Sequence, residues 1–475
     1  MRQLYGVLVL LILGGSPLFG QDSLDLAACI DYAWQHNPQI KQAGIQQRQA
    51  ELNRKQASWA FYPTLNASFR HGLNLGRSID FTSYQYVNQS TQSSQLSLNT
   101  NFPIYQGLRL RNQLKQSRLD VQATAQDLEQ AKQTNALSVA QAYLQVLLAE
   151  ENLQVLQAQK ALTEEQLAQT LKQIKAGNLP DNSRLELEAQ QARDEQAIVN
   201  AENTIELAYV NLKVLINMPV DEKIRLKVIE LQLPEARELE TLDELYLEAA
   251  ANMPNMAANR LREESADLAI KVAEGALMPS LGGYVSLTSN YSSAAKERTT
   301  EQTTQTLFLD VNGTQVPVEF PTVRTIEGGT TPYFEQVGNN LYTNVGVSLS
   351  VPIFNGFQSR IAIERAKLNL ELAKLNSSQA QNQLKADIQR ALTDVKAARK
   401  SLEAAQKSLA ATSASAANTR KRFELGIVNS FELSSVQNML TSAASSVVQA
   451  KYDLLFKLKV LDFYRGIGLN TPPEN

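Results

Sequence analysis

The chain has 475 residues, enough for two or three ordinary domains, and a formal net charge of −3. Its lysines and arginines form no basic block, so the sequence excludes nucleic acid as an expected partner. A single cysteine excludes any disulfide bond within the chain.

Residues 1–20 have the features of a secretory signal peptide. Arg2 supplies the positive charge, an apolar core follows, and small residues precede the cleavage that we expect after Gly20. No later segment is an apolar run of about 18 residues or more, so no transmembrane helix is expected.

Cys29 ends a Leu-Ala-Ala-Cys segment that looks like a lipoprotein-type processing site. Cys29 also shares one helical face with Leu26 and Ile30, and the acidic Asp22 and Asp25 separate it from the apolar core of the signal peptide. We therefore expect a buried helix position at Cys29 and no lipidation.

Residues 21–220 predict one structural unit that begins with a helix over 23–58, with Ser23 as its N-cap and a break at Asn37-Pro38. After Pro63 apolar residues recur at every second position. This period predicts strands with one apolar face at about 64–75 and 92–104, separated by a polar loop.

Residues 108–176 contain no glycine or proline and are rich in strong helix formers with apolar residues at helical spacing. A helix of this length would measure on the order of 100 Å, at about 1.5 Å per residue. It is expected to end at Gly177, and a returning helix is expected at 184–217.

A linker over 221–240 is expected to contain one short strand, and the same order of elements then begins again over 241–469. Asn37-Pro38 and Pro63 recur as Met253-Pro254 and Pro279 at one interval, which indicates a duplication. The second unit predicts strands at about 280–291 and 341–353 with a longer loop between them, a long helix at 357–425, a returning helix at 430–465, and a C-terminal tail at 470–475.

Four two-faced strands are too few for a membrane barrel, because the smallest outer-membrane barrels have about eight. Two arrangements remain open: a soluble sandwich, or a barrel to which several chains contribute strands. The long helices lead away from each strand pair, which favours the second arrangement, since a soluble sheet normally finds its cover within its own domain.

Two strand-to-helix junctions and one helix tip carry a family resemblance. They are the segments Phe102–Gly107, Val351–Gly356 and Phe423–Val428, whose order and duplication resemble the TolC family of outer-membrane efflux proteins over essentially all of the mature chain. The resemblance implies a mainly α fold with a membrane β-barrel. A homotrimer would form a twelve-stranded barrel in the outer membrane, continued by a twelve-helix α-barrel in the periplasm.

The resemblance also implies a function. The trimer would be a channel-tunnel of the cell outer membrane, in contact with its lipid and extending into the periplasm. It would be no enzyme, and would give passive exit to substrates delivered by a periplasmic membrane-fusion adaptor and an inner-membrane transporter of RND or ABC type. The adaptor is expected to contact the helix tips, at Gly177, Asn178, Leu179, Gly426, Ile427 and Val428.

The family resemblance further implies a periplasmic gate just past Gly426, made of an arginine and two acidic residues. Here Val428 replaces the arginine, Glu432 keeps the first acidic position, and Ser435 replaces the second. Three carboxylates in a narrow pore would attract and hold cations. The alternative for any single glutamate is a solvated helix face.

Glu186 and Glu188 lie at the equivalent place in the first unit, where they would add charge to the gate at the same height.

No cofactor or metal is expected. His36 and His71 lack acids or cysteines at metal-ligand spacing, and the sequence has no phosphate-binding loop. No Ser-His-Asp set stands out either.

The rival function is a periplasmic coiled-coil tether or adhesin stalk. Such a rod would carry strict heptads with large core residues, whereas residues 409–417 are mostly Ala, Ser and Thr. A general diffusion porin is excluded because it would be almost entirely strand.

Overall fold

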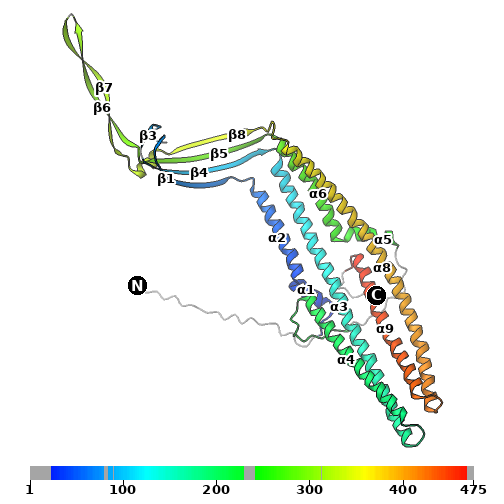
Figure 1. Ribbon diagram of the computed structural model, residues 1–475. Coiled ribbons are helices and arrows are strands. Elements are labelled where there is room, and N and C mark those ends of the chain that lie inside the picture. Colours follow the sequence, from blue (N-terminus) through cyan, green and yellow to red (C-terminus); the bar gives the residue numbers. More distant parts are fainter. Residues whose placement is uncertain (1–22, 80–83, 89, 229–240, 312, 468–475) are drawn as a thin grey trace, which may run out of the picture. The chain divides into compact units, whose positions relative to one another are not determined.

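A computed structural model describes residues 23–79, 84–88, 90–228, 241–311 and 313–467 (Figure 1). The signal peptide at 1–20, linker residues 229–240 and the tail at 470–475 lie outside this part of the chain. The chain divides into two compact units, one made of Met1–Glu51, Leu119–Glu263 and Glu371–Asn475, and the other of Leu52–Arg118 and Glu264–Leu370.

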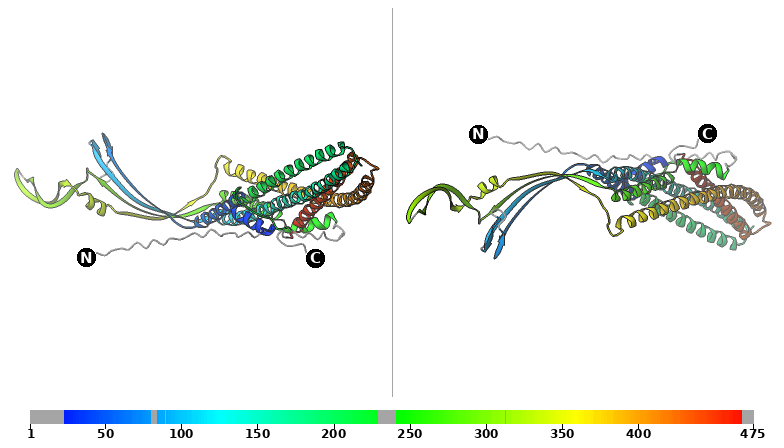
Figure 2. Two further views of the ribbon diagram at one scale, coloured as in Figure 1. Left: turned by 90° about the horizontal axis from the view of Figure 1, so that it is seen from below. Right: turned by 90° about the horizontal axis from the view of Figure 1, so that it is seen from above.

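Long helices dominate the chain, and the pairs α3–α4 and α8–α9 each form an antiparallel helical hairpin (Figure 1, Figure 2). The two longest helices, α3 and α8, are one residue shorter at each end than the predicted ranges. Each is preceded and followed by a turn that contains a glycine with positive φ. The helices are α1 Leu26–His36, α2 Pro38–Trp59, α3 Arg109–Lys175, α4 Asn182–Ile216, α5 Leu242–Asn252, α6 Pro254–Glu274, α8 Gln358–Glu424 and α9 Ser430–Tyr464.

The N-terminal helix begins later than predicted. The N-cap is Asp25 and not Ser23, since the Asp25 carboxylate accepts a hydrogen bond from the backbone N–H of Ala28 at 2.8 Å. The predicted break at Asn37-Pro38 separates α1 from α2, and the Asn37 side chain caps α2 by accepting from the N–H of Gln39 at 2.8 Å.

The main apolar core joins α1, α3, α4 and α9. Tyr143 is fully buried in it, and its hydroxyl donates to the carbonyl oxygens of Leu24 at 3.2 Å and Lys227 at 2.6 Å. In the described part of the linker, Leu226 makes one isolated parallel bridge to Leu24, so the strand predicted there is wrong. Leu226 is also buried in the main core, and Ile224 packs against that core, so this segment is held against the helices by apolar packing as well as by hydrogen bonds.

Four antiparallel strands form one sheet in the order β1-β4-β5-β8. Leu98 lies opposite Ala67 on one side and Leu287 on the other, so apolar side chains share one face across the sheet. This face is exposed in the single chain. The strands are β1 Thr64–Asn74, β4 Thr91–Gln106, β5 Ser280–Ser292 and β8 Tyr342–Ser350, the last ending before the predicted residue 353.

The connections β1–β4 and β5–β8 contain strands where the sequence predicts only loops. The first holds a short hairpin of β2 Arg77–Ile79 and β3 Tyr86–Asn88. The second holds a long hairpin of β6 Lys296–Val311 and β7 Thr314–Thr330, followed by the helix α7 Tyr333–Asn339. The dipeptide Asn312-Gly313 is a sequence signal for a hairpin turn, and the long hairpin could have been predicted from it.

The two strand-to-helix junctions have the same unusual backbone. Gly107 and Leu108 have φ of 57° and 62°, and Gly356 and Phe357 both have φ of 62°. A Cβ on Gly107 would lie 2.4 Å from the carbonyl oxygen of Gly275, which belongs to the short 3-10 helix η1 Gly275–Leu277, so the backbones meet closely there. Glycine is required at Gly107 for both its conformation and its lack of a side chain.

Among the residues that the structure describes, no helix combines the length and the apolar character needed to cross a membrane.

Candidate functional site

The two helix tips have the same turn. Gly177 and Gly426 have φ of 77° and 71°. In each turn the N–H after the glycine bonds back to a carbonyl five residues earlier, from Asn178 to Gln173 at 2.9 Å and from Ile427 to Arg422 at 2.9 Å. This is a glycine-based helix C-cap, which reverses the chain within a few residues.

A small apolar cluster fixes the second tip. Phe423, Val428 and Leu433 are buried together, and Leu179 from the first tip packs against them. Ile427 is 61% exposed and Val428 is 7% exposed. Of these two neighbouring tip residues, Ile427 is therefore the one that a partner could contact.

Glu432 lies in the first turn of α9, where Asn429 caps the helix by accepting from the Glu432 N–H at 2.9 Å. Its carboxylate lies 3.6 Å from the guanidinium of Arg422. A basic partner for Glu432 is therefore present, but it comes from the last turn of α8 and not from position 428. Ser435 is partly buried one turn further along α9.

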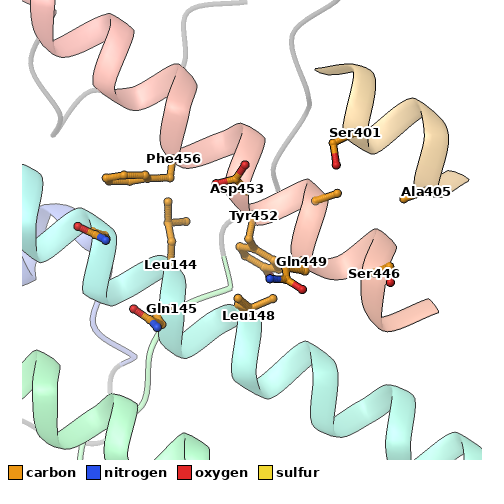
Figure 3. A pocket seen from close by; sticks show the side chains of 12 residues that line it. Leu144, Gln145, Leu148, Ser401, Ala405, Ser446, Gln449, Tyr452, Asp453 and Phe456 are labelled. Carbon is orange, nitrogen blue, oxygen red and sulfur yellow. The ribbon is translucent and has the colours of Figure 1, made fainter. Parts of the chain in front are cut away.

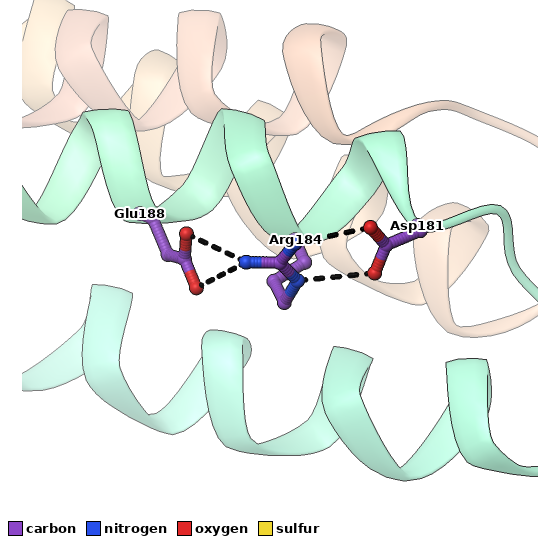
Figure 4. Close-up of polar contacts among 3 residues, drawn as sticks. All are labelled: Asp181, Arg184 and Glu188. Carbon is purple, nitrogen blue, oxygen red and sulfur yellow. Dashed lines mark hydrogen bonds and ion pairs between the residues drawn. The ribbon is translucent and has the colours of Figure 1, made fainter.

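Glu188 and Arg184 form a paired cluster with Asp181 at the start of α4 (Figure 4). The Arg184 guanidinium bonds both oxygens of Glu188 at 2.9 Å and both oxygens of Asp181 at 3.0 Å. These bonds hold the pKa of Asp181 below its ordinary value. Part of the acidic charge expected from Glu188 is thus compensated by Arg184.

Glu186 connects the two hairpins. Its carboxylate accepts from the Asn182 amide at 2.9 Å and from the Ser430 hydroxyl at the start of α9. Its side chain is therefore tied to α9.

Above the tips, the packing between α3, α4 and α9 is polar. Asp194 is buried and accepts from the Thr163 hydroxyl at 2.6 Å and from the Gln190 amide at 2.7 Å. The Gln190 amide also donates a hydrogen bond to the side-chain oxygen of Asn438 on α9 at 3.0 Å. Within the described chain, side-chain atoms of Gln166 and Gln437 are buried without a protein partner. Sequence reasoning missed this layer, because Gln and Thr on a helix ordinarily indicate a solvated face.

A groove of about 520 Å³ lies between α3, α8 and α9 (Figure 3). Leu144 and Leu148 line one side, Ser401 and Ala405 another, and Tyr452 and Phe456 a third. The lining mixes apolar side chains with the amides of Gln145 and Gln449 and the carboxylate of Asp453.

Cys29 is a residue of α1, and its side chain is fully buried in the main apolar core. Burial, with a smaller effect of the Asp25 charge, raises the pKa of its thiol to about 12.

Each histidine has its own local partner, since His36 bonds the Tyr32 carbonyl at 2.9 Å and His71 bonds the Ser94 hydroxyl at 2.8 Å. In the described ranges no group of three His, Cys, Asp or Glu side chains could hold a metal ion.

Comparison with known proteins finds a match to the sequence profile of a family described as outer membrane efflux protein, over residues 29–218 and 245–466. No curated protein matches the sequence.

Several solved structures are similar in fold at low sequence identity. CusC has 15% identity and a TM-score of 0.73, over 95% of this chain and 96% of CusC. VceC from Vibrio cholerae has 14% identity and a TM-score of 0.71, over 94% of this chain and 96% of VceC. The Campylobacter jejuni CmeC outer membrane channel has 17% identity and a TM-score of 0.71, over 93% of this chain and 86% of CmeC.

Proposed function

Because the chain belongs to the outer membrane efflux protein family, whose members are channels of the outer membrane that extend into the periplasm, we propose that three copies form a passive export duct. Each copy contributes four strands to a twelve-stranded barrel and its helical hairpins to a periplasmic tube. The chain is a TolC-like efflux protein of the outer membrane, and it performs no chemistry on its cargo.

The exposed apolar face of the four-stranded sheet carries this proposal. Phe69, Val345 and Val347 are large, exposed side chains on that face. Within the described residues, β1 and β8 each pair on one side only. An open edge in lipid costs several kcal/mol for each unpaired backbone group, on the order of 3 kcal/mol or more. Pairing β8 of one copy with β1 of the next removes every edge.

The repeated order of elements supports a duplicated architecture. We infer that residues 21–220 and 241–469 are two copies of one unit, joined by the linker at 221–240. The shared backbone of Gly107 and Gly356 at the strand-to-helix junctions, and of Gly177 and Gly426 at the tips, agrees with this inference.

We further propose that the helix tips form the periplasmic entrance. Glu432 is half exposed there and supplies the charge of the gate, while Ile427 supplies an apolar contact for an adaptor. The buried Val428 would support that contact from within, and Gly177, Asn178, Leu179 and Gly426 would shape it. The transporter would deliver substrate through this entrance.

The coiled-coil tether remains the second candidate, but a tether has no use for a sheet with an exposed apolar face. Its buried helix positions would also be large and apolar, whereas Thr163, Gln190 and Asp194 are buried here.

A pair of arginine variants in β8 tests the barrel. Val345 lies on the apolar face, and its neighbour Asn344 lies on the opposite face. An arginine on the lipid side of a barrel costs roughly 2–4 kcal/mol near the bilayer centre. Val345→Arg should therefore reduce the amount of trimer recovered from membranes far more than Asn344→Arg.

Light scattering in detergent gives the mass of each variant and of the unchanged protein. A stable folded monomer of the unchanged protein, or equal effects of both arginines, would refute the barrel.

A further inference from the structure

The hairpin of β6 and β7 stands apart from the four-stranded sheet. Among the described residues these two strands pair only with each other, from Val311 opposite Thr314 at the turn to Lys296 opposite Thr330 at the base (Figure 1, Figure 2). At about 3.4 Å per residue the ribbon is roughly 50 Å long. An isolated two-stranded ribbon is marginal in water, so another surface must stabilise it.

The base of the hairpin is fixed. The buried Gln336 of α7 accepts from the Ser292 N–H at 3.0 Å and donates to the carbonyl oxygens of Ser292 at 3.0 Å and Thr331 at 2.7 Å. The Thr331 N–H closes the base by donating to the Ala295 carbonyl at 3.0 Å. The ribbon therefore leaves the end of β5 in a defined direction.

The ribbon has two unlike faces. Residues directly opposite each other in an antiparallel pair share a face, and neighbouring pairs alternate. One face is mixed: it has polar pairs such as Thr306 opposite Glu319, and it also carries Phe308 opposite Pro317 and Val323 opposite Gln302. The other is apolar toward the turn, and we call it the apolar hairpin face: Leu307, Leu309, Val316, Val318 and Phe320, with Gln305 opposite Phe320.

The apolar hairpin face lies open in the single chain, where Leu307 is 52% exposed and Phe320 is 44% exposed. Along β7, Pro317 and Pro321 lack the N–H that an added strand would need. These prolines disfavour pairing along the β7 edge, and the open apolar side chains make the face a surface left to be covered.

We propose that the apolar hairpin faces of three copies pack together about the axis of the trimer. This inference rests on the trimer of the proposed function. The hairpin and α7 are inserted between β5 and β8, and the free edge of β8 is the proposed seam with the next copy. Three hairpins therefore arise at equivalent places around one axis.

Charge complementarity favours another copy over lipid as the occupant. Glu301 on β6 lies opposite Arg324 on β7, on the same side of the ribbon as the apolar hairpin face. With three ribbons around an axis, β6 of one copy neighbours β7 of the next, which brings Glu301 to Arg324 of the next copy. A charged pair on this face would be costly in lipid.

The packed hairpins would form a crown of six strands. β4 and β8 lead into α3 and α8 at one end of the sheet, and the hairpin leaves from the opposite end, which in the proposed channel faces the outside. The crown would narrow the extracellular exit and add contact between subunits.

Two single-cysteine variants test the crown. Gln305→Cys places a thiol on the apolar hairpin face, and Thr306→Cys places one on the opposite, mixed face, one residue away along β6. The native Cys29 has no exposed surface and should not react. A short bis-maleimide is added to each purified trimer, and covalent dimers are counted on a denaturing gel.

The crown requires cross-linked dimers with Gln305→Cys and their loss with Thr306→Cys. Equal cross-linking of both variants, or none with Gln305→Cys in a sample whose mass is that of a trimer, would overturn it and leave lipid or another protein as the occupant. A monomer by light scattering would instead refute the trimer itself, so the two failures are distinguishable.

Discussion

Arg422 in the last turn of α8 and Glu432 in the first turn of α9 face each other across the second helix tip, 3.6 Å apart. Each also suits its own helix, because a cation stabilises a helix C-terminus and an anion an N-terminus. The side chains are 46% and 50% exposed, and a pair this exposed contributes roughly 0–1 kcal/mol. The contact can therefore open at little cost, which leaves the carboxylate free to meet a cation.

Cys29 should be an unmodified and unreactive thiol in the folded protein. An acylated cysteine could not occupy the core under α1, and burial raises the pKa of the thiol to about 12 from an ordinary value of 9.0. Maleimide labelling of the native protein, read by intact mass, should stay slow from about pH 7 to pH 9, while the denatured protein labels quickly.

Because the folded pKa of Cys29 is the higher one, its contribution to stability is complete below about pH 9 and is lost as the pH rises towards 12. Cys29→Ala should remove this part of the alkaline loss of stability. A mature chain that carries acyl mass on Cys29 would contradict the prediction.

The junction glycines should differ in their tolerance of alanine. Both Gly107 and Gly356 have positive φ, so alanine at either costs about 1–2 kcal/mol of backbone strain. At Gly107 the added methyl also meets the Gly275 carbonyl oxygen at 2.4 Å and the Met278 side chain at 2.6 Å, whereas at Gly356 nothing lies within 4 Å.

Thermal unfolding should therefore show a clearly larger loss for Gly107→Ala than for Gly356→Ala. Equal losses would mean that the backbones at Gly107 and Gly275 separate without cost.

The polar layer should be sensitive to loss of Asp194. Asp194→Ala removes the hydrogen bonds from the Thr163 hydroxyl and the Gln190 amide, at about 0.5–1.5 kcal/mol for each bond, because the two donors keep the Gln159 carbonyl at 3.2 Å and the Asn438 side chain at 3.0 Å as acceptors. The adjacent Glu195 pairs with Lys160 at 3.1 Å, with its side chain 53% exposed, so Glu195→Ala is a matched control worth roughly 1 kcal/mol or less.

Urea unfolding followed by helical circular dichroism measures both variants. If they had the same midpoint, the hydrogen bonds of Asp194 would contribute nothing net.

The sequence predicted the helices well because their signals are local. Apolar spacing and the glycines at 177 and 426 define α3 and α8 without reference to any other part of the chain. The sequence does not predict the hairpin of β6 and β7 as readily, because its Thr, Gln and Glu residues are typical of a polar loop, although every second residue of β7 near the turn is apolar.

The site was less predictable because it depends on the fold of the tips. Arg422 approaches Glu432 only because the turn at Gly426 reverses the chain between them. The pairing of Glu188 with Arg184 is different, because the two residues are four apart on α4 and this spacing is itself a sequence signal for an ion pair. No periodic pattern reports the contact of Arg422 with Glu432.

The gate leads to the last prediction. If three copies of Glu432 surround the periplasmic entrance, Glu432→Gln should weaken block of the channel by divalent or trivalent cations in planar-bilayer recordings. A charge about 4 Å from a cation contributes about 1 kcal/mol in a water-like medium, so losing three should weaken block roughly tenfold or more.

Glu424→Gln is the matched control, because Glu424 is an equally exposed acid in the last turn of α8, 3.5 Å from Arg420. Arg422→Ala should act in the opposite direction and strengthen block, because it frees the Glu432 carboxylate from its partner. Unchanged block in Glu432→Gln, with the trimer intact, would place the cation-binding ring elsewhere and make Glu186 and Glu188 the next residues to test.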